Sequence, residues 1–180
     1  MVDTADWISA GLAELGESGI GGVRVEVLAR RLGVTKGGFY RRFKDRPALL
    51  DAILDHWVEG RIAAIRQQMR LGSGNARERL RIVVNLFAER TNAEGLAVEL
   101  AIRSWARRDA RASAAVLRVD EQRLDEVARL YGELGKSPTE ARCSAVLFYA
   151  FVFGQGLLFL DPEPEARARM IDSCAGLLGL

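Results

Sequence analysis

Two short apolar stripes that meet across a tight turn are the feature that most constrains how this chain can fold. Apolar residues recur at helical spacing over residues 25–32 and again over residues 39–43. Gly33 follows the first stripe, where a glycine commonly ends a helix, and Thr35 is expected to cap the second. The pattern predicts a helix-turn-helix over residues 23–46.

The rest of the chain also has the periodicity of helices, and no segment has the alternation of a strand. Thr4 is expected to cap a first helix, and Ser137, Pro138 and Glu140 together form a strong helix start. The 180 residues contain only four prolines, which would interrupt such helices. The sequence therefore predicts an all-α fold of about nine helices.

Positive charge is concentrated in one window of a chain whose net charge is only +2. Residues 1–21 carry four acidic residues and no basic one, whereas residues 22–46 carry eight basic residues and only Glu26 and Asp45 as acids. Residues 47–180 are then neutral overall. Charge alone leaves two interpretations open, a solvated basic face or a surface that binds a polyanion.

The sequence lacks the residue patterns that are typical of enzymes and of metal-binding proteins. It has one histidine, His56, two cysteines without metal-ligand spacing, and neither a nucleophile elbow nor a phosphate-binding loop. We therefore expect no enzyme, no cofactor and no metal site. The first residues are acidic and amphipathic rather than signal-like, and the apolar stretch at residues 145–160 is too short for a membrane span. These features favour a cytoplasmic protein with reduced thiols.

The helix-turn-helix resembles that of the TetR family of bacterial repressors. The matching landmarks, all within residues 4–57, are Leu28-Ala29, Gly33-Val34-Thr35-Lys36-Gly37, Phe39-Tyr40, Phe43-Lys44 and Leu49-Leu50. The resemblance implies a three-helix DNA-binding module over residues 1–46. It further implies a helical bundle domain for effector binding and dimerisation over residues 47–180.

The first turn of the recognition helix is expected to enter the major groove of DNA. Gly37 and Gly38 lower helix propensity there but let the backbone approach DNA closely. Tight packing against the preceding helix is the alternative explanation for both glycines. The resemblance implies phosphate contacts for Tyr40 and Arg42, although the family usually has histidine at the position of Arg42.

Arg24 is a second departure from the family pattern, because Ser or Thr commonly caps the helix at this position. An arginine cannot cap, and its charge is unfavourable at a helix N-terminus, which favours a phosphate partner over a freely moving surface side chain. Lys36 and Arg41 could contact bases or phosphates. The expected contacts to double-stranded DNA are Arg24, Thr35, Lys36, Gly37, Gly38, Tyr40, Arg41, Arg42 and Lys44.

A homodimer is expected, because one module offers too small a surface for tight operator binding. Two recognition helices would then lie about one DNA turn apart. The helix at residues 145–160 is apolar on too many faces for a single buried stripe, and the family forms a dimer bundle from the last two long helices. The expected interface residues are Val146, Tyr149, Phe153, Leu157, Leu160 and Met170.

Aromatic and aliphatic side chains on the central helices could line a pocket for a small apolar or amphipathic effector. Most side chains of this kind are simply core, so the pocket is the least constrained part of the prediction. The candidate residues are Trp57, Phe87, Ile102, Trp105, Leu147, Phe148 and Phe151, with Arg103 as a polar anchor.

The sequence thus predicts a DNA-binding transcriptional regulator, most often a repressor, that a small effector releases from a partly palindromic operator. The alternative is a DNA-binding regulator without a small-molecule ligand, switched by a protein partner or by oxidation of Cys143 or Cys174. Both cysteines lie on apolar helices, which favours inert, buried thiols.

Overall fold

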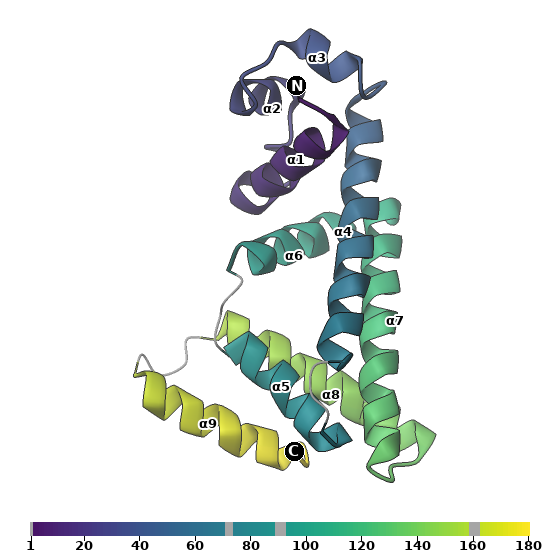
Figure 1. Ribbon diagram of the computed structural model, residues 1–180, viewed down its shortest axis with the longest axis vertical. Helices are drawn as coiled ribbons and strands as arrows, with labels where there is room; N and C mark the ends of the chain where they lie inside the picture. The colour runs from purple at the N-terminus through teal and green to yellow at the C-terminus, as the bar shows by residue number, and fades with distance from the viewer. Residues whose placement is uncertain (1, 71–73, 89–92, 159–162) are drawn as a thin grey trace. The chain divides into compact units, whose positions relative to one another are not determined.

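The computed structural model describes residues 2–70, 74–88, 93–158 and 163–180. Within these ranges the chain forms nine α-helices and no strand, which confirms the predicted all-α fold (Figure 1). The helices are α1 (Thr4–Ser18), α2 (Val25–Arg31), α3 (Lys36–Tyr40), α4 (Arg46–Arg70), α5 (Ala76–Ala88), α6 (Ala93–Ala106), α7 (Ala110–Glu133), α8 (Pro138–Leu157) and α9 (Pro164–Leu177).

The first of two compact units comprises Met1–Arg61 and Asn92–Val119. In this unit α2 packs against α1 and α3, and α6 packs against α1 (Figure 1). Trp7, Leu28 and Phe39 have almost no exposed surface and form the centre of its core. The helix-turn-helix is therefore supported by helices from two separate stretches of the sequence.

A glycine lets α6 approach α1 closely. A Cβ atom at Gly16 would lie 3.2 Å from Val98 Cγ2 and 3.5 Å from the backbone nitrogen of Val98. A side chain at this position would therefore fit only if the Val98 side chain moved by a few tenths of an ångström. Leu15, the residue before Gly16, has no exposed surface.

Asp3 caps α1, so the expected cap at Thr4 is wrong. Asp3 Oδ1 accepts a hydrogen bond from the backbone nitrogen of Asp6 at 3.0 Å, and Asp6 Oδ2 accepts one from the backbone nitrogen of Asp3 at 2.7 Å. This reciprocal capping box satisfies two amide groups, whereas a cap at Thr4 would start the helix one residue later. The helix ends at Gly19, whose φ of 68° is favourable only for glycine.

The second compact unit comprises Ile62–Thr91 and Asp120–Leu180. Buried apolar side chains from α4, α5, α7, α8 and α9 form its core, in which α5 packs against α8 and α9. The predicted helix start is confirmed, because Pro138 is the first residue of α8 and Ser137 caps it. The backbone nitrogen of Ser137 donates to Glu140 Oε2 at 3.0 Å and completes a capping box.

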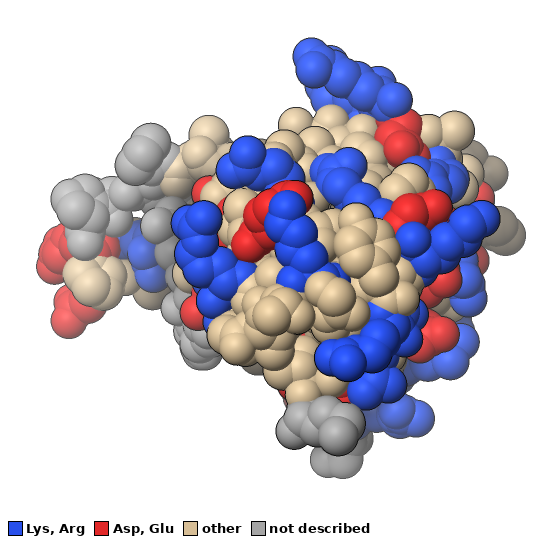
Figure 2. Space-filling model, turned by 90° about the horizontal axis from the view of Figure 1, so that it is seen from above, with Lys and Arg blue, Asp and Glu red and all other residues tan. Residues whose placement is uncertain are grey.

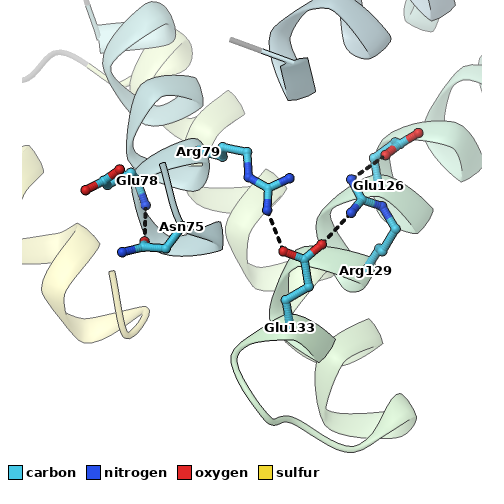
Figure 3. A network of polar contacts seen from close by, with 6 residues as sticks. All are labelled: Asn75, Glu78, Arg79, Glu126, Arg129 and Glu133. Atoms are coloured by element: carbon cyan, nitrogen blue, oxygen red, sulfur yellow. Dashed lines mark hydrogen bonds and ion pairs between the residues drawn. The ribbon is translucent and has the colours of Figure 1, made fainter. Parts of the chain in front are cut away.

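An ion-pair network joins α5 to α7 at the surface of the second unit (Figure 3). Glu133 of α7 accepts hydrogen bonds from Arg79 of α5 and from Arg129 one turn earlier on its own helix. In the same region Asn75 caps α5 by accepting a hydrogen bond from the backbone nitrogen of Glu78 at 3.1 Å. These contacts fix the start of α5 beside the end of α7.

The two compact units do not follow a division after residue 46. Residues 47–61 and 92–119 fold in the same unit as the helix-turn-helix. A functional division into a DNA-binding module over residues 1–46 and an effector domain over 47–180 stays a prediction.

The described ranges hold neither a membrane-spanning helix nor a metal cluster. None of their helices combines the length and the apolar character that crossing a bilayer requires. Nowhere in these ranges do three His, Cys, Asp or Glu side chains come together as metal ligands would.

Candidate DNA-binding surface

Helix α3, the predicted recognition helix, is short and is anchored by a single buried side chain. Phe39 is fully buried, and its ring centroid lies 5.3 Å from that of Trp7, edge to face, and 5.5 Å from that of Phe43. Aromatic contacts of this geometry hold the ring in one orientation. Because Phe39 faces inward, the residues on the opposite side of α3 face outward.

The tip of α3 is exposed and carries both glycines. Thr35, Lys36 and Gly37 are exposed, and Gly38 is partly exposed. Thr35 occupies the N-cap position, but its side chain makes no capping hydrogen bond. A Cβ atom added at Gly37 or Gly38 would have no neighbour closer than 3.7 Å. Packing against the preceding helix therefore does not require glycine at either position.

We expect that alanine at Gly37 and Gly38 leaves the fold intact and weakens DNA binding. Alanine favours a helix by about 1 kcal/mol over an exposed glycine, so the melting temperature should rise or stay unchanged. A methyl group at the tip keeps the backbone away from DNA, and the affinity for operator DNA, measured by fluorescence anisotropy, should fall roughly tenfold. Gly60→Ala is the matched control, because this exposed position of α4 has open space around it. Unchanged DNA affinity in the double variant would contradict the role of the glycines.

Cationic side chains surround the tip of α3. Tyr40 is 63% exposed, and Arg41, Arg42 and Lys44 are exposed in the turn that follows. Arg24 is exposed at the N-cap position of α2 and makes no capping hydrogen bond with its side chain. Figure 2 looks onto the end where Figure 1 draws α2 and α3, and Lys and Arg side chains lie all around that face with Asp and Glu among them. The structure thus brings the residues predicted to contact DNA together on α3, the turn after it and the start of α2.

Arg42 also contacts the N-terminal segment. Its Nη2 donates to the carbonyl oxygen of Val2 over 3.5 Å, a long hydrogen bond. The pKa of the Asp3 carboxyl is lowered mainly by the hydrogen bond from the backbone of Asp6, and the nearby charge of Arg42 adds a smaller contribution. The guanidinium of Arg42 remains exposed beside these groups.

Two short hydrogen bonds fasten the start of α4 to the segment between α1 and α2. Arg46 Nε donates to the carbonyl oxygen of Val23 at 2.6 Å, and Arg46 Nη2 donates to that of Ile20 at 2.7 Å. Beside it, Asp45 caps α4 by accepting a hydrogen bond from the backbone nitrogen of Ala48 at 2.9 Å. Sequence reasoning counted Arg46 only as one charge of the basic window. No residue pattern could identify its acceptors, because they are backbone carbonyls that the turn brings into reach.

The residues predicted to line an effector pocket fall in both compact units. The first unit contains Trp57, Ile102, Arg103 and Trp105, and the second contains Phe87, Leu147, Phe148 and Phe151. All of them are buried or partly buried except Leu147, which is 60% exposed. A pocket that they share stays a prediction.

Arg103 pairs with a buried carboxylate that sequence reasoning passed over. Glu99 is 1% exposed, its Oε1 lies 2.9 Å from Arg103 Nη2, and its Oε2 lies 3.7 Å from Arg61 Nη1. Trp57, one turn before Arg61 on α4, has a buried Nε1 without a hydrogen-bond partner among the described residues. The spacing of Glu99 and Arg103 on one helix could have signalled the first ion pair. Arg61 is too far away in the sequence for a pattern to reveal the second.

The predicted dimer contacts divide into exposed and buried residues. On α8 and α9, Val146 is 50% exposed, Leu157 59% and Met170 47%. Tyr149 is only 7% exposed in the core of the second unit, and Phe153 packs against that core. Leu160 lies outside the described residues.

The two cysteines have different environments. Cys143 is exposed, so the expectation of a buried thiol is wrong at this position, and Cys174 is partly buried. Ala141 and Ala145, two residues before and after Cys143, are buried. Cys143 therefore lies on the opposite face of α8, because residues two apart on a helix point to opposite sides.

The stretch that forms the helix-turn-helix matches a known protein family. Residues 8–53, from α1 to the first turns of α4, match the family model for bacterial regulatory proteins of the tetR family. No curated protein matches the sequence. The family match covers the exposed tip of α3 and the cations around it.

Solved structures of transcriptional regulators share the fold over nearly the whole chain. A transcriptional regulator from Rhodococcus sp. RHA1 is similar with a TM-score of 0.77 and 18% identity, covering 98% of this chain and 96% of that one. A Rhodococcus sp. structure assigned to the TetR-family transcriptional regulators has a TM-score of 0.72 and 23% identity, with 97% of each chain covered. The regulator FadR from Bacillus subtilis, solved in complex with stearoyl-CoA, has a TM-score of 0.68 and 17% identity, covering 97% of this chain and 96% of its own.

Proposed function

We propose that this chain is a DNA-binding transcriptional regulator of the TetR family, which residues 8–53 match, and that it acts as a dimeric repressor of a partly palindromic operator. The match to bacterial regulatory proteins supports a regulator rather than an enzyme. A small apolar or amphipathic effector is proposed to release it from DNA, in the cytoplasm where a bacterial regulator meets its operator. The observation that carries the proposal is the exposed, glycine-containing tip of α3, held in place by the buried ring of Phe39.

The tip of α3 is proposed to enter the major groove, with Lys36 and the two glycines at the edges of the bases. Tyr40, Arg42 and Arg24 are proposed to bind phosphates on either side, where they fix the register of the protein on DNA. All three are exposed in the structure, which supports this division of roles. Binding is expected to weaken steeply with salt, because the arginines and lysines displace counterions.

A second copy of the chain is proposed to pack against α8 and α9. Val146, Leu147 and Leu157 of α8 are each at least 50% exposed, and Met170 and Leu177 of α9 are 47% and 89% exposed. Side chains this apolar are seldom exposed together on a monomer unless the surface is an interface. Tyr149 and Phe153 then support the interface from within the subunit.

The effector is proposed to act by binding one of two dimer conformations better than the other. A ligand shifts such an equilibrium only by its difference in affinity for the two states, so it must prefer the dimer whose recognition helices are wrongly spaced for DNA. The complex of FadR with stearoyl-CoA supports a small-molecule effector in a protein of this fold. Arg103, which pairs with Glu99 and lies on α6 close in sequence to Ile102 and Trp105, is proposed as the polar anchor.

Selection of bound sequences from random duplex DNA tests the proposal. We expect one enriched motif of two inverted half-sites about one helical turn apart, since two recognition helices related by twofold symmetry require that spacing. Sedimentation of the free protein should give the mass of a dimer. Recovery of no motif, or of a single half-site bound by a monomer, would contradict the proposal.

Arg42→Ala is expected to weaken the binding of all DNA sequences by a similar factor. A phosphate contact carries no base information, so the sequence preference should stay while the slope of log affinity against log salt becomes shallower by about 0.9 for each phosphate that is no longer neutralised. Titrations at several salt concentrations measure both quantities. Arg77→Ala, which removes the same charge from the exposed surface of α5, is the control and should leave the slope unchanged. A change of sequence preference in Arg42→Ala would instead assign Arg42 to a base.

A further inference from the structure

An acidic side chain lies at the end of the surface that is proposed to enter the groove, and it is paired with a cation. Glu26 lies in the first turn of α2, and Lys36 is the first residue of α3. Glu26 Oε1 lies 2.6 Å from Lys36 Nζ, and the two side chains are 56% and 58% exposed. The ion pair therefore joins the two helices of the helix-turn-helix on a surface that is open to a partner.

Folding stability does not explain this ion pair. Pairs between exposed side chains contribute little net stability, because water screens the charges and both side chains lose conformational freedom. A carboxylate on a DNA-binding surface also repels phosphates. A residue that adds little to folding and opposes binding to the DNA backbone fits a role in discriminating between sequences.

The two side chains present complementary hydrogen-bonding groups. The hydrogen bond from Lys36 is the main cause that lowers the pKa of the Glu26 carboxyl, so this group is ionised at neutral pH. An ionised carboxylate only accepts hydrogen bonds, and an ammonium group only donates them. One donor and one acceptor thus stand side by side at the tip of the recognition surface.

We infer that Glu26 and Lys36 act together to read one base pair, preferentially G·C, in the major groove. Guanine presents its N7 and O6 as acceptors there, and the N4 amino group of the paired cytosine presents a donor next to them. Lys36 donates to guanine while Glu26 accepts from cytosine, so both charged groups exchange part of their ion pair for hydrogen bonds to bases. An A·T pair fits less well in the same position, because it places the donor N6 of adenine opposite the ammonium group, where guanine has O6, and the acceptor O4 of thymine opposite the carboxylate, where cytosine has N4.

The same arrangement limits contact between Lys36 and the DNA backbone. A phosphate that approaches the ammonium group also approaches the Glu26 carboxylate, and the two anions repel each other. Lys36 therefore contributes more to the choice of sequence than to non-specific affinity. This inference rests on the DNA binding proposed above and adds the residues that choose the base pair.

The test uses the operator that selection from random DNA identifies, with each base pair of the half-site replaced in turn. Fluorescence anisotropy measures the binding of each duplex to the full-length protein and to its Glu26→Ala and Lys36→Ala variants. The unaltered protein is expected to prefer G·C at one position by roughly tenfold or more, and both variants should lose most of that preference at that same position. The affinity of Glu26→Ala for unrelated duplex DNA should rise, because a repulsive charge has been removed.

Glu59→Ala is the matched control, since it removes an equal charge from an exposed position of α4 and should keep every preference. A uniform change of affinity over all base pairs in Glu26→Ala would overturn the inference and leave Glu26 with a general electrostatic effect. Loss of preference at different positions in the two variants would overturn it as well. If the unaltered protein selects no sequence at all, the proposed function fails, and the inference fails with it.

Discussion

Replacing Phe39 with alanine is expected to lower the free energy of unfolding by about 3–5 kcal/mol, the usual cost of removing a large buried aromatic side chain. Phe39 has no exposed surface and contacts the rings of Trp7, Tyr40 and Phe43. Without this ring, α3 has no buried side chain to hold it against the rest of the unit. DNA binding should therefore disappear even at temperatures where the rest of the chain stays folded.

Urea denaturation followed by circular dichroism measures the stability, and tryptophan fluorescence follows the environment of Trp7. Tyr40→Ala is the control on the neighbouring residue, because Tyr40 is 63% exposed and loses mainly the edge contact with Phe39, so its replacement should lower the free energy of unfolding by only about 1 kcal/mol. Together the two variants distinguish the buried side of α3 from the exposed side that is proposed to face DNA. Equal stability of Phe39→Ala and Tyr40→Ala would show that α3 is not held by its buried face.

Glu99→Ala is expected to destabilise the protein by about 3 kcal/mol, because it leaves two arginines beside each other without their buried counter-ion. This loss of stability is at the lower end of the range for removing one partner of a buried ion pair. The side chains of Arg61 and Arg103 are 24% and 29% exposed, so they keep some contact with water. Glu99→Gln should cost less, because the amide oxygen can still accept a hydrogen bond from Arg103.

Glu94→Ala is the matched control for Glu99, since it removes the same group from an exposed position of the same helix, α6. Its effect on the midpoint of chemical denaturation should be small. If the two alanine variants melt alike, Glu99 is solvated in solution and the buried ion pair does not contribute to the fold.

The parts of the fold that local sequence decides could be predicted, and the start of α8 is the clearest example. Ser137, Pro138 and Glu140 act within one turn of the chain, so their chemistry is complete in the sequence. The helix-turn-helix could be predicted for the same reason, because the stripe, the glycine and the buried aromatic rings lie within one short stretch. Asp3 shows the limit of this logic, since two neighbouring polar residues could both cap α1 and only the geometry selected one of them.

Features that join distant parts of the chain could not be predicted. The ion pair between Glu99 and Arg61 joins residues of two different helices. Likewise, the hydrogen bonds of Arg46 depend on two carbonyl oxygens that face it only after the turn between α1 and α2 has formed.

The faces of α8 could not be assigned from sequence because this helix is apolar nearly all round. When a helix has no polar face, its residue pattern alone does not show which face is turned toward the core. The structure buries Tyr149 and exposes Val146 and Leu147, three residues that the pattern does not distinguish. The exposure of Cys143 escaped prediction for the same reason.

The packing of α6 on α1 has a consequence for the newly made chain. The ribosome releases α1 to α4 well before α6, so the face of α1 next to Gly16 stays uncovered until the segment around Val98 has emerged. Helices α1 to α3 therefore cannot complete their packing while only the first third of the chain has emerged from the ribosome. In a fragment that ends after the helix-turn-helix, the face of α1 that α6 normally covers would stay exposed to solvent. Truncated proteins made for DNA-binding assays should therefore aggregate unless they retain α6.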